Sequence, residues 1–117
     1  MSHTATSTFG FGVKINPALL VESGLARFER FYPEEALDPL EFPLLTTAVS
    51  GFSPNEEYWV LVKSSVVSLY SGLSGTGMFA PVPDRKLSAE EESQMGKWME
   101  KAHQQTVPQN VILQYFN

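Results

Sequence analysis

One stretch near the start of the sequence decides the fold: Phe9-Gly10-Phe11-Gly12-Val13-Lys14-Ile15. Large apolar side chains alternate there with glycine or lysine, and a period of two residues is typical of a β-strand. Glycine weakens the interior of a strand, so Gly10 and Gly12 need an explanation. A bulge, or close approach of another backbone or of a ligand, would provide one, but we expect a helix or an aromatic ring packed flat over them.

Working outward, the residues after this strand predict a helix. Asn is a good N-cap and Pro suits the first helical position, so Asn16-Pro17 marks the start. Gly24 either ends a short helix or is tolerated within a longer one. Apolar residues continue at helical spacing beyond it, and we expect a long or broken helix that reaches about Tyr32 and ends at Pro33.

Three further strands and a second helix follow. The strands are predicted over Leu44 to Phe52, Glu57 to Lys63, and Val111 to Phe116. Val66 to Tyr70 either continues the second of these after a bulge or forms a strand of its own. Ser88-Ala89-Glu90-Glu91 is a capping box, which predicts a helix running to about Gln105.

The element order β-α-β-β-α-β is that of the ferredoxin-like split βαβ sandwich. We therefore expect an α+β fold with four to five mostly antiparallel strands and two helices on one face. Residues 1–7 are rich in Ser, Thr and Ala and are expected to form a flexible tail. Residues 8–117 are expected to form a single α+β domain.

Composition narrows the classes of function. The 117 residues contain no cysteine, which excludes disulfides and thiolate chemistry and fits a reducing, cytoplasmic location. The net charge is −5, and the eight Lys and Arg are dispersed, so we expect no nucleic-acid binding. The sequence shows no signal-peptide pattern and no apolar run near the ~18 residues of a membrane helix, so we expect no membrane partner.

Catalytic patterns are missing from the sequence. Its two histidines, His3 and His103, have no partners at metal-ligand spacing, and no serine sits in a Gly-x-Ser-x-Gly pattern. We expect a surface or capping role for His103. A catalytic pair of carboxylates stays open in principle, but the prediction is a protein that is not an enzyme, with no catalytic residues, no metal site and no cofactor.

A glycine-rich stretch at Ser71 to Gly77 is one candidate binding site. Glycines let successive backbone amides converge on an anion, and hydroxyl groups can add donors. No P-loop pattern accompanies them, and a plain loop is the alternative. The candidate ligand-binding residues are Ser71, Gly72, Ser74, Gly75, Thr76, Gly77, Arg85 and Lys86.

An acidic and aromatic stretch is the second candidate. Such mixed surfaces suit docking on a basic partner, although a solvated acidic turn is the alternative. The candidate partner-binding residues are Phe31, Tyr32, Glu34, Glu35, Asp38 and Glu41. A terminal strand that lies at an edge of the sheet would offer a third surface, because its unpaired backbone groups can pair with a partner or with a second copy. Exposed Tyr115 and Phe116 in the last strand would favour a homodimer.

Short, acidic, cysteine-free chains with few catalytic residues are typical of small accessory proteins, such as phage-encoded or immunity-type inhibitors. The sequence therefore predicts a non-catalytic protein-interaction module that acts through the acidic-aromatic surface or a sheet edge. The alternative is a protein that binds a small anionic ligand, such as a nucleotide or phosphate compound, at the glycine-rich stretch. In one version of this alternative, the site lies at a dimer interface.

Overall fold

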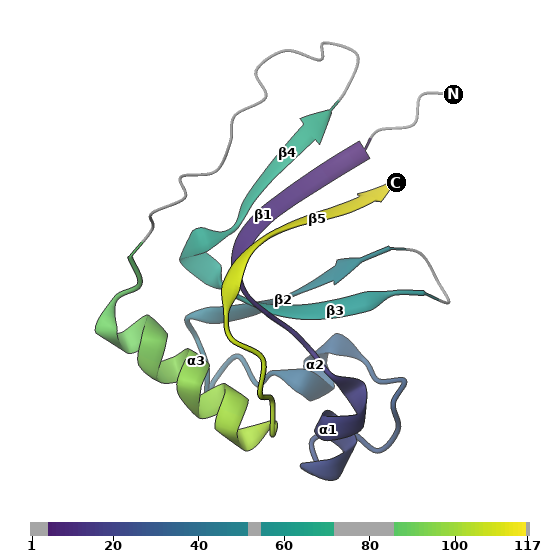
Figure 1. The fold of residues 1–117 in the computed structure, drawn as a ribbon, viewed down its shortest axis with the longest axis vertical. Helices are drawn as coiled ribbons and strands as arrows, with labels where there is room; N and C mark the ends of the chain where they lie inside the picture. Colours follow the sequence, from purple (N-terminus) through teal and green to yellow (C-terminus); the bar gives the residue numbers. More distant parts are fainter. Residues whose placement is uncertain (1–4, 52–54, 72–85, 117) are drawn as a thin grey trace.

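A single strand, β1 (Ala5–Lys14), organises the fold (Figure 1). The computed structural model describes residues 5–51, 55–71 and 86–116. The other elements are α1 (Pro17–Glu22), α2 (Pro33–Ala36), β2 (Leu45–Ser50), β3 (Glu57–Val62), a 3-10 turn (Lys63–Ser65), β4 (Val67–Ser71), α3 (Ala89–Lys101) and β5 (Gln109–Phe116).

All the described strand pairs are antiparallel, and β1 takes part in three of them. Along one edge β1 pairs with β5. Along its other edge it pairs first with β4 and then with β3, and β3 in turn pairs with β2. The prediction of an α+β fold with four to five mostly antiparallel strands is therefore confirmed.

The chain from β3 to β4 is one strand path interrupted by the 3-10 turn. Phe9 pairs with Val67, and Gly12 pairs with Leu61, so the turn adds residues on this path that have no counterpart on β1. The hydroxyl of Ser65 fills the gap, because it accepts from the amide of Phe11 at 2.9 Å and donates to the carbonyl of Val62 at 2.6 Å. Both alternatives thus hold in part, because β4 is a strand of its own and yet follows the same edge of β1 as β3.

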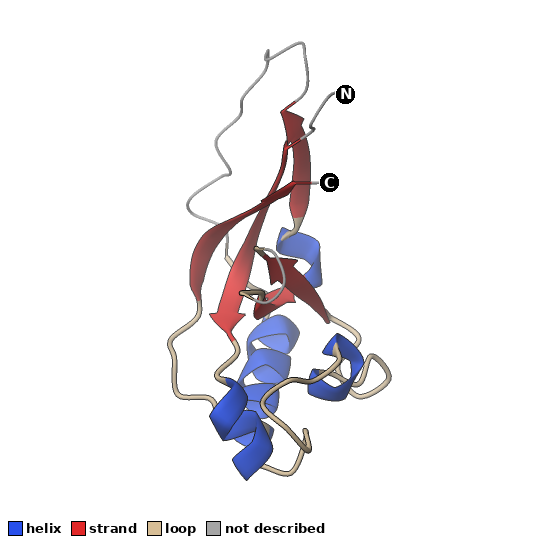
Figure 2. Cartoon of the chain, turned by 90° about the vertical axis from the view of Figure 1, so that its right-hand side faces the viewer, coloured by secondary structure: helices blue, strands red, loops and turns tan. Residues whose placement is uncertain are grey.

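The helices lie together at one end of the molecule, and β1, β4 and β5 extend beyond them at the other end (Figures 1 and 2). The main core lies between these helices and one face of the sheet, with Val13, Val60, Leu20 and Trp98 fully buried in it. The described residues contain three α-helices where two were expected. The ferredoxin-like arrangement, with two helices on one face, is not confirmed.

The first helix is shorter than predicted, since α1 ends at Glu22. Its start is as expected, because the Asn16 side chain accepts from the Ala18 amide at 3.1 Å. Its end is set by Gly24, whose φ of 82° turns the backbone into the left-handed region, where glycine carries no steric cost. The amide of Leu25 then closes on the carbonyl of Leu20 at 3.2 Å, which completes the helix end.

The apolar residues between Leu25 and Tyr32 therefore belong to irregular chain, and the predicted extension of the helix is wrong. Pro33 does not end a helix but begins one, as the first residue of α2. Proline has no backbone amide, and the amide at the first helical position has no partner within the helix in any case. Proline can therefore begin a helix as well as follow the end of one.

The atoms that approach the two glycines of β1 most closely belong to β3, not to a helix or an aromatic ring. A Cβ built on Gly12 would lie 1.9 Å from the backbone oxygen of Val60, and one built on Gly10 would lie 2.7 Å from the Leu61 side chain. The strand β3 itself passes too close for any larger residue at position 12. Close approach of another backbone, one of the explanations considered for a glycine within a strand, therefore accounts for Gly12.

At its other end β1 is longer than expected, because it begins at Ala5, inside the expected tail. Residues 5–9 pair with both β4 and β5, so each has neighbours on both edges. Within the described ranges, no helix is long and apolar enough to cross a bilayer.

Candidate functional site

An apolar groove of about 350 Å³ lies between α3 and the sheet. Four separate parts of the chain form it: β1, the residue before the cap of α3, α3 itself, and the segment that leads into β5. Its lining residues are Phe11, Leu87, Glu92, Met95, Gly96, Met99, Val107 and Pro108. We refer to this feature as the α3 groove.

The helix wall of the groove is a single stripe. Glu92, Met95, Gly96 and Met99 stand at spacings of three and four residues, which places them on one face of α3. The start of α3 is fixed by its capping box, in which the Ser88 hydroxyl accepts from the Glu91 amide at 3.1 Å and the Glu91 carboxylate accepts from the Ser88 amide at 2.8 Å. The predicted capping box is therefore confirmed.

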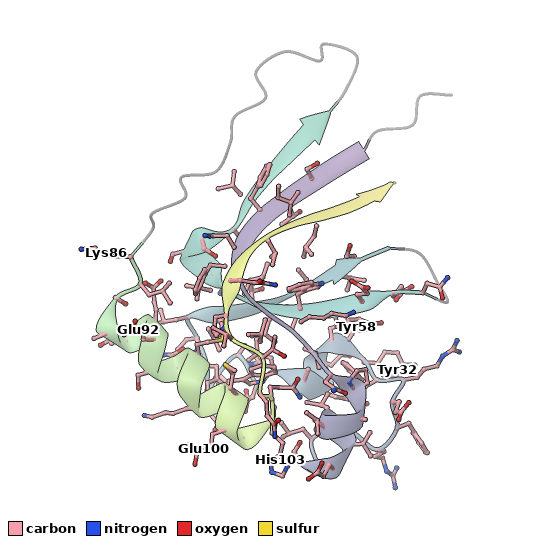
Figure 3. All side chains as sticks on the ribbon, viewed as in Figure 1. Tyr32, Tyr58, Lys86, Glu92, Glu100 and His103 are labelled. Atoms are coloured by element: carbon pink, nitrogen blue, oxygen red, sulfur yellow. The ribbon has the colours of Figure 1, made fainter. Side chains whose placement is uncertain are left out.

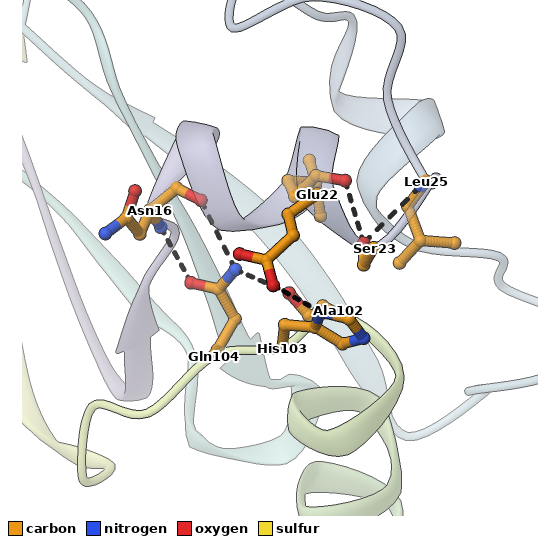
Figure 4. Close-up of polar contacts among 8 residues, drawn as sticks. Asn16, Glu22, Ser23, Leu25, Ala102, His103 and Gln104 are labelled. Carbon is orange, nitrogen blue, oxygen red and sulfur yellow. Dashed lines mark hydrogen bonds and ion pairs between the residues drawn. The ribbon is translucent and has the colours of Figure 1, made fainter.

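The opposite wall depends on how the chain leaves α3 (Figure 4). His103 has a φ of 58° and turns the backbone away from the helix axis. The side-chain oxygen of Gln104 then accepts from the Asn16 amide at 2.7 Å, and its nitrogen donates to the Ala102 carbonyl at 2.9 Å. This clamp holds the exit from α3 against the start of α1 and so sets the course of Val107 and Pro108.

Gly96 keeps the groove open. A Cβ built there meets no atom within 4 Å, so no contact in the described part of the chain requires glycine. Glycine in a helix interior nevertheless costs about 1 kcal/mol relative to alanine. A larger side chain at this position would occupy the groove.

The apolar surface continues from the groove along the sheet. Phe11 and Phe9 point to the same face of β1 because they are two residues apart. Phe9 pairs with Val67 on one side and Ile112 on the other, so these three form a row on that face. Phe9 is buried, whereas Val67 and Ile112 are 50% and 58% exposed. We refer to this row as the upper strip.

The charge at the groove is negative. Glu92 is the one charged residue among its lining residues, and it has no ion-pair partner among the side chains that the structure describes. The nearest described cations along the chain are Lys97, which lines the outer side of α3, and Lys86, which projects away from the body of the molecule (Figure 3). An apolar floor with a carboxylate at its rim can bind apolar groups that carry a positive charge nearby.

The structure divides the predicted acidic-aromatic residues. Phe31 is buried, and its ring lies 5.0 Å from that of Tyr58, so it contributes to the core and not to an exposed surface. Tyr32 is 70% exposed and points outward (Figure 3), and Glu34 and Glu35 are exposed in the first turn of α2.

The remaining two acids already have partners within the molecule. The Asp38 carboxylate accepts from the Leu40 amide at 2.9 Å, and Glu41 pairs with Lys101 of α3 at 2.5 Å. The Trp98 indole donates to the Ala36 carbonyl at 2.7 Å. The whole segment is thereby fixed to α3, and its free acidic part shrinks to Glu34 and Glu35.

Little of the predicted glycine-rich site falls within the described residues. Ser71 is the last residue of β4, and Lys86 is exposed before α3. Gly72, Ser74, Gly75, Thr76, Gly77 and Arg85 lie outside the described residues.

Two other features bear on the choice of site. A hollow on the outer side of α3, lined by Ala89, Glu90, Ser93, Gln94 and Lys97, is more polar than the α3 groove. Across the described stretches, no three His, Asp or Glu side chains gather as they would around a metal ion.

The α3 groove was missed from the sequence. Met95 and Met99 stand at the spacing of an apolar helix stripe, which is typical of a core face, but only Met95 is buried and Met99 is partly exposed. The available sequence signals were Gly96 within a capped helix and Val107 beside Pro108. Val107 is 77% exposed in the structure. Comparison with protein-family models, curated proteins and solved structures found no match, so the fold and the groove alone support a function.

Proposed function

We propose that the protein is a non-catalytic protein-interaction module that binds an apolar segment of another protein. The observation that carries this proposal is the continuous apolar surface formed by the α3 groove and the upper strip. Exposed apolar patches rimmed by polar residues commonly mark interaction sites. Methionine is well suited to such a site because its flexible side chain adapts to different partners.

The shape of the surface favours a protein segment. At about 350 Å³ the groove is near the lower end of the range of ligand pockets, about 300–1,000 Å³, and suits one or two large side chains. The exposed side chains of Val67 and Ile112 extend the contact beyond it along β1. A segment with several apolar side chains can contact both parts, as peptides do when they lie in hydrophobic grooves.

A test fills the groove and leaves the rest of the surface unchanged. Peptides would be selected from a displayed random library with the wild-type protein as bait, and their dissociation constants measured for two variants. Gly96→Trp places a large ring in the groove, at a position with free space around it. Ser93→Trp adds the same ring on the outer side of α3 and serves as the control.

We expect the selected peptides to bind the wild-type and Ser93→Trp proteins alike and to lose at least about tenfold in affinity for Gly96→Trp, a difference of about 1.4 kcal/mol. Peptides that bind Gly96→Trp equally well, or a selection that yields none, would overturn the proposal.

A small-molecule binder is the second candidate, because the volume of the groove still lies within the range of ligand pockets. The ligand would then be apolar and would not use the glycine-rich stretch. Native mass spectrometry of gently purified protein distinguishes the two, because a retained ligand adds its mass to the subunit. The same spectrum reports whether the protein is a homodimer.

Tyr32, Glu34 and Glu35 form a smaller candidate contact for the same or another partner. Reversing the charge of both acids with Glu34→Lys and Glu35→Lys would test it, since charge at the rim of an interface mainly changes the association rate. A cytoplasmic location, an inhibitor or accessory role, and a phage or immunity origin also stay proposals, which rest on composition and charge.

The ferredoxin-like arrangement is likewise proposed as the parent of this fold. The order β5, β1, β3, β2 across the sheet supports it, with β4 as an addition along the edge that β3 also uses. Fold alone implies no function, so this proposal adds nothing to the choice between the candidates.

A further inference from the structure

We infer that the partner segment is basic and amphipathic, with a Lys or Arg close to the apolar side chain that enters the α3 groove. This inference rests on the proposed function, because it specifies the partner of the same surface. It follows from the position of one carboxylate, that of Glu92, among seven uncharged lining residues.

Glu92 is available to a partner. It is exposed, and no ion pair engages it within the described residues. It stands one helical turn before Gly96 on the same stripe of α3, so a cation that meets it lies next to whatever fills the open space above Gly96. Lysine and arginine also have long apolar stems, which can cover apolar surface while the charged end reaches the carboxylate.

The surroundings strengthen the selection for positive charge. The upper strip offers no charged residue, and the net charge of the chain is −5. An acidic segment would therefore meet repulsion from both Glu92 and the overall field, whereas a basic segment would be attracted from a distance. The contribution of the pair is expected to fall as salt rises, because the carboxylate is exposed to solvent.

A pair of charge reversals on one helix tests this inference. Glu92→Lys reverses the charge at the groove, and Glu90→Lys reverses it at the outer hollow. Both residues lie in the first turn of α3, so the two variants change the net charge and the interaction with the helix dipole alike. The probes are the peptides selected from the random library, and the readouts are their sequences and their dissociation constants at two salt concentrations.

We expect Lys or Arg to be enriched within about four residues of the apolar anchor in the selected peptides. Glu92→Lys should weaken binding about tenfold at low salt, a loss that shrinks at high salt, while Glu90→Lys should change it by less than about threefold.

The failure of this inference is distinguishable from the failure of the proposed function. Peptides without basic residues, or peptides that Glu92→Lys and Glu90→Lys bind equally well, would overturn the basic partner. If those same peptides still lose affinity for Gly96→Trp, the groove stays the binding site. If they do not, the proposed function falls with the inference.

Discussion

The amide of Gln104 joins two parts of the chain that are far apart in sequence, the end of α3 and the start of α1. It is buried, and its oxygen is the hydrogen-bond acceptor for the Asn16 amide. Its nitrogen donates to the Ala102 carbonyl in a buried hydrogen bond. Removing the partner of a buried polar group leaves that group without the water it had in the unfolded chain, which costs about 1–3 kcal/mol.

Gln104→Ala should therefore lower the free energy of unfolding by about 1–3 kcal/mol in urea denaturation. Gln105→Ala removes the neighbouring exposed amide and should change it by less than about 0.5 kcal/mol. Equal losses in the two variants would show that the clamp contributes nothing specific to the exit from α3.

The phenol of Tyr58 should make the free energy of unfolding decrease at alkaline pH. Burial raises the pKa of Tyr58 above its ordinary value of 10.0, the hydrogen bond to Glu56 and the charge of that carboxylate raise it further, and Arg30 opposes them. The neutral phenol is therefore favoured in the folded protein. Its contribution is fully present below pH 10 and is lost as the pH rises from there through the pKa of the folded state.

Absorbance titration of the phenolate checks this dependence. Glu56→Gln removes the charged acceptor and should lower the pKa of Tyr58 toward its ordinary value. Glu57→Gln removes the adjacent carboxylate, which pairs with Lys14 instead, and should leave the titration of Tyr58 unchanged. The idea fails if the stability of wild-type and Tyr58→Phe proteins falls in parallel above pH 10.

At the scale of elements, the best-defined unit is α3, which forms one wall of the groove. Its capping box satisfies backbone amides that a helix start otherwise leaves without partners. Ser88→Ala should lower the free energy of unfolding by about 1 kcal/mol, as loss of an N-cap does elsewhere.

Ser93→Ala supplies the control within the same helix. Ser93 is exposed in the helix interior, where alanine has the higher helix propensity, so this change should leave stability unchanged or raise it by a few tenths of a kcal/mol. Thermal unfolding followed by circular dichroism measures both variants, and a smaller loss for Ser88→Ala than for Ser93→Ala would contradict the assigned cap.

Elements with local signals could be predicted from the sequence. The cap at Ser88, the start at Asn16-Pro17 and the alternation along β1 each depend on residues within one turn or one strand. The end of α1 could not be predicted in this way. Leu25, Phe28 and Phe31 continue the helical spacing, but the left-handed backbone at Gly24 interrupts it, and Phe31 is then buried by tertiary contacts instead.

The α3 groove and the strand order are beyond local patterns for the same reason. Phe11 and Val107 line one groove although nearly the whole chain separates them. Likewise, the period of β1 predicts a strand, but nothing in it specifies that three other strands will pair with it.

For the molecule as a whole, β1 spans two environments. Val13, in the helix-covered end of β1, and Ile15, just beyond it, belong to the main core cluster. Among the described side chains at positions 7–9, none belongs to that cluster. The part formed by β1, β4 and β5 extends past the helices (Figure 2). Local stability in proteins follows such differences in apolar burial.

Amide hydrogen exchange measured by NMR should therefore resolve two levels along this one strand. We expect the amides at positions 12–14 to exchange only on global unfolding and those at positions 6–8 to exchange at least about tenfold faster through local opening. Uniform protection along β1 would instead indicate that the whole sheet opens as one unit.

The pairing of β1 with β5 also has a consequence for how the protein is made. Ala5 lies opposite Phe116, so one edge of the first strand keeps its backbone groups unpaired until the last strand has been translated and has left the ribosome. Long-range strand pairing of this kind is slow, and an open strand edge can associate with other chains while it waits. Nascent chains of this protein should therefore depend on chaperones that shield such an edge during synthesis, even though the finished sheet gives β1 neighbours on both sides.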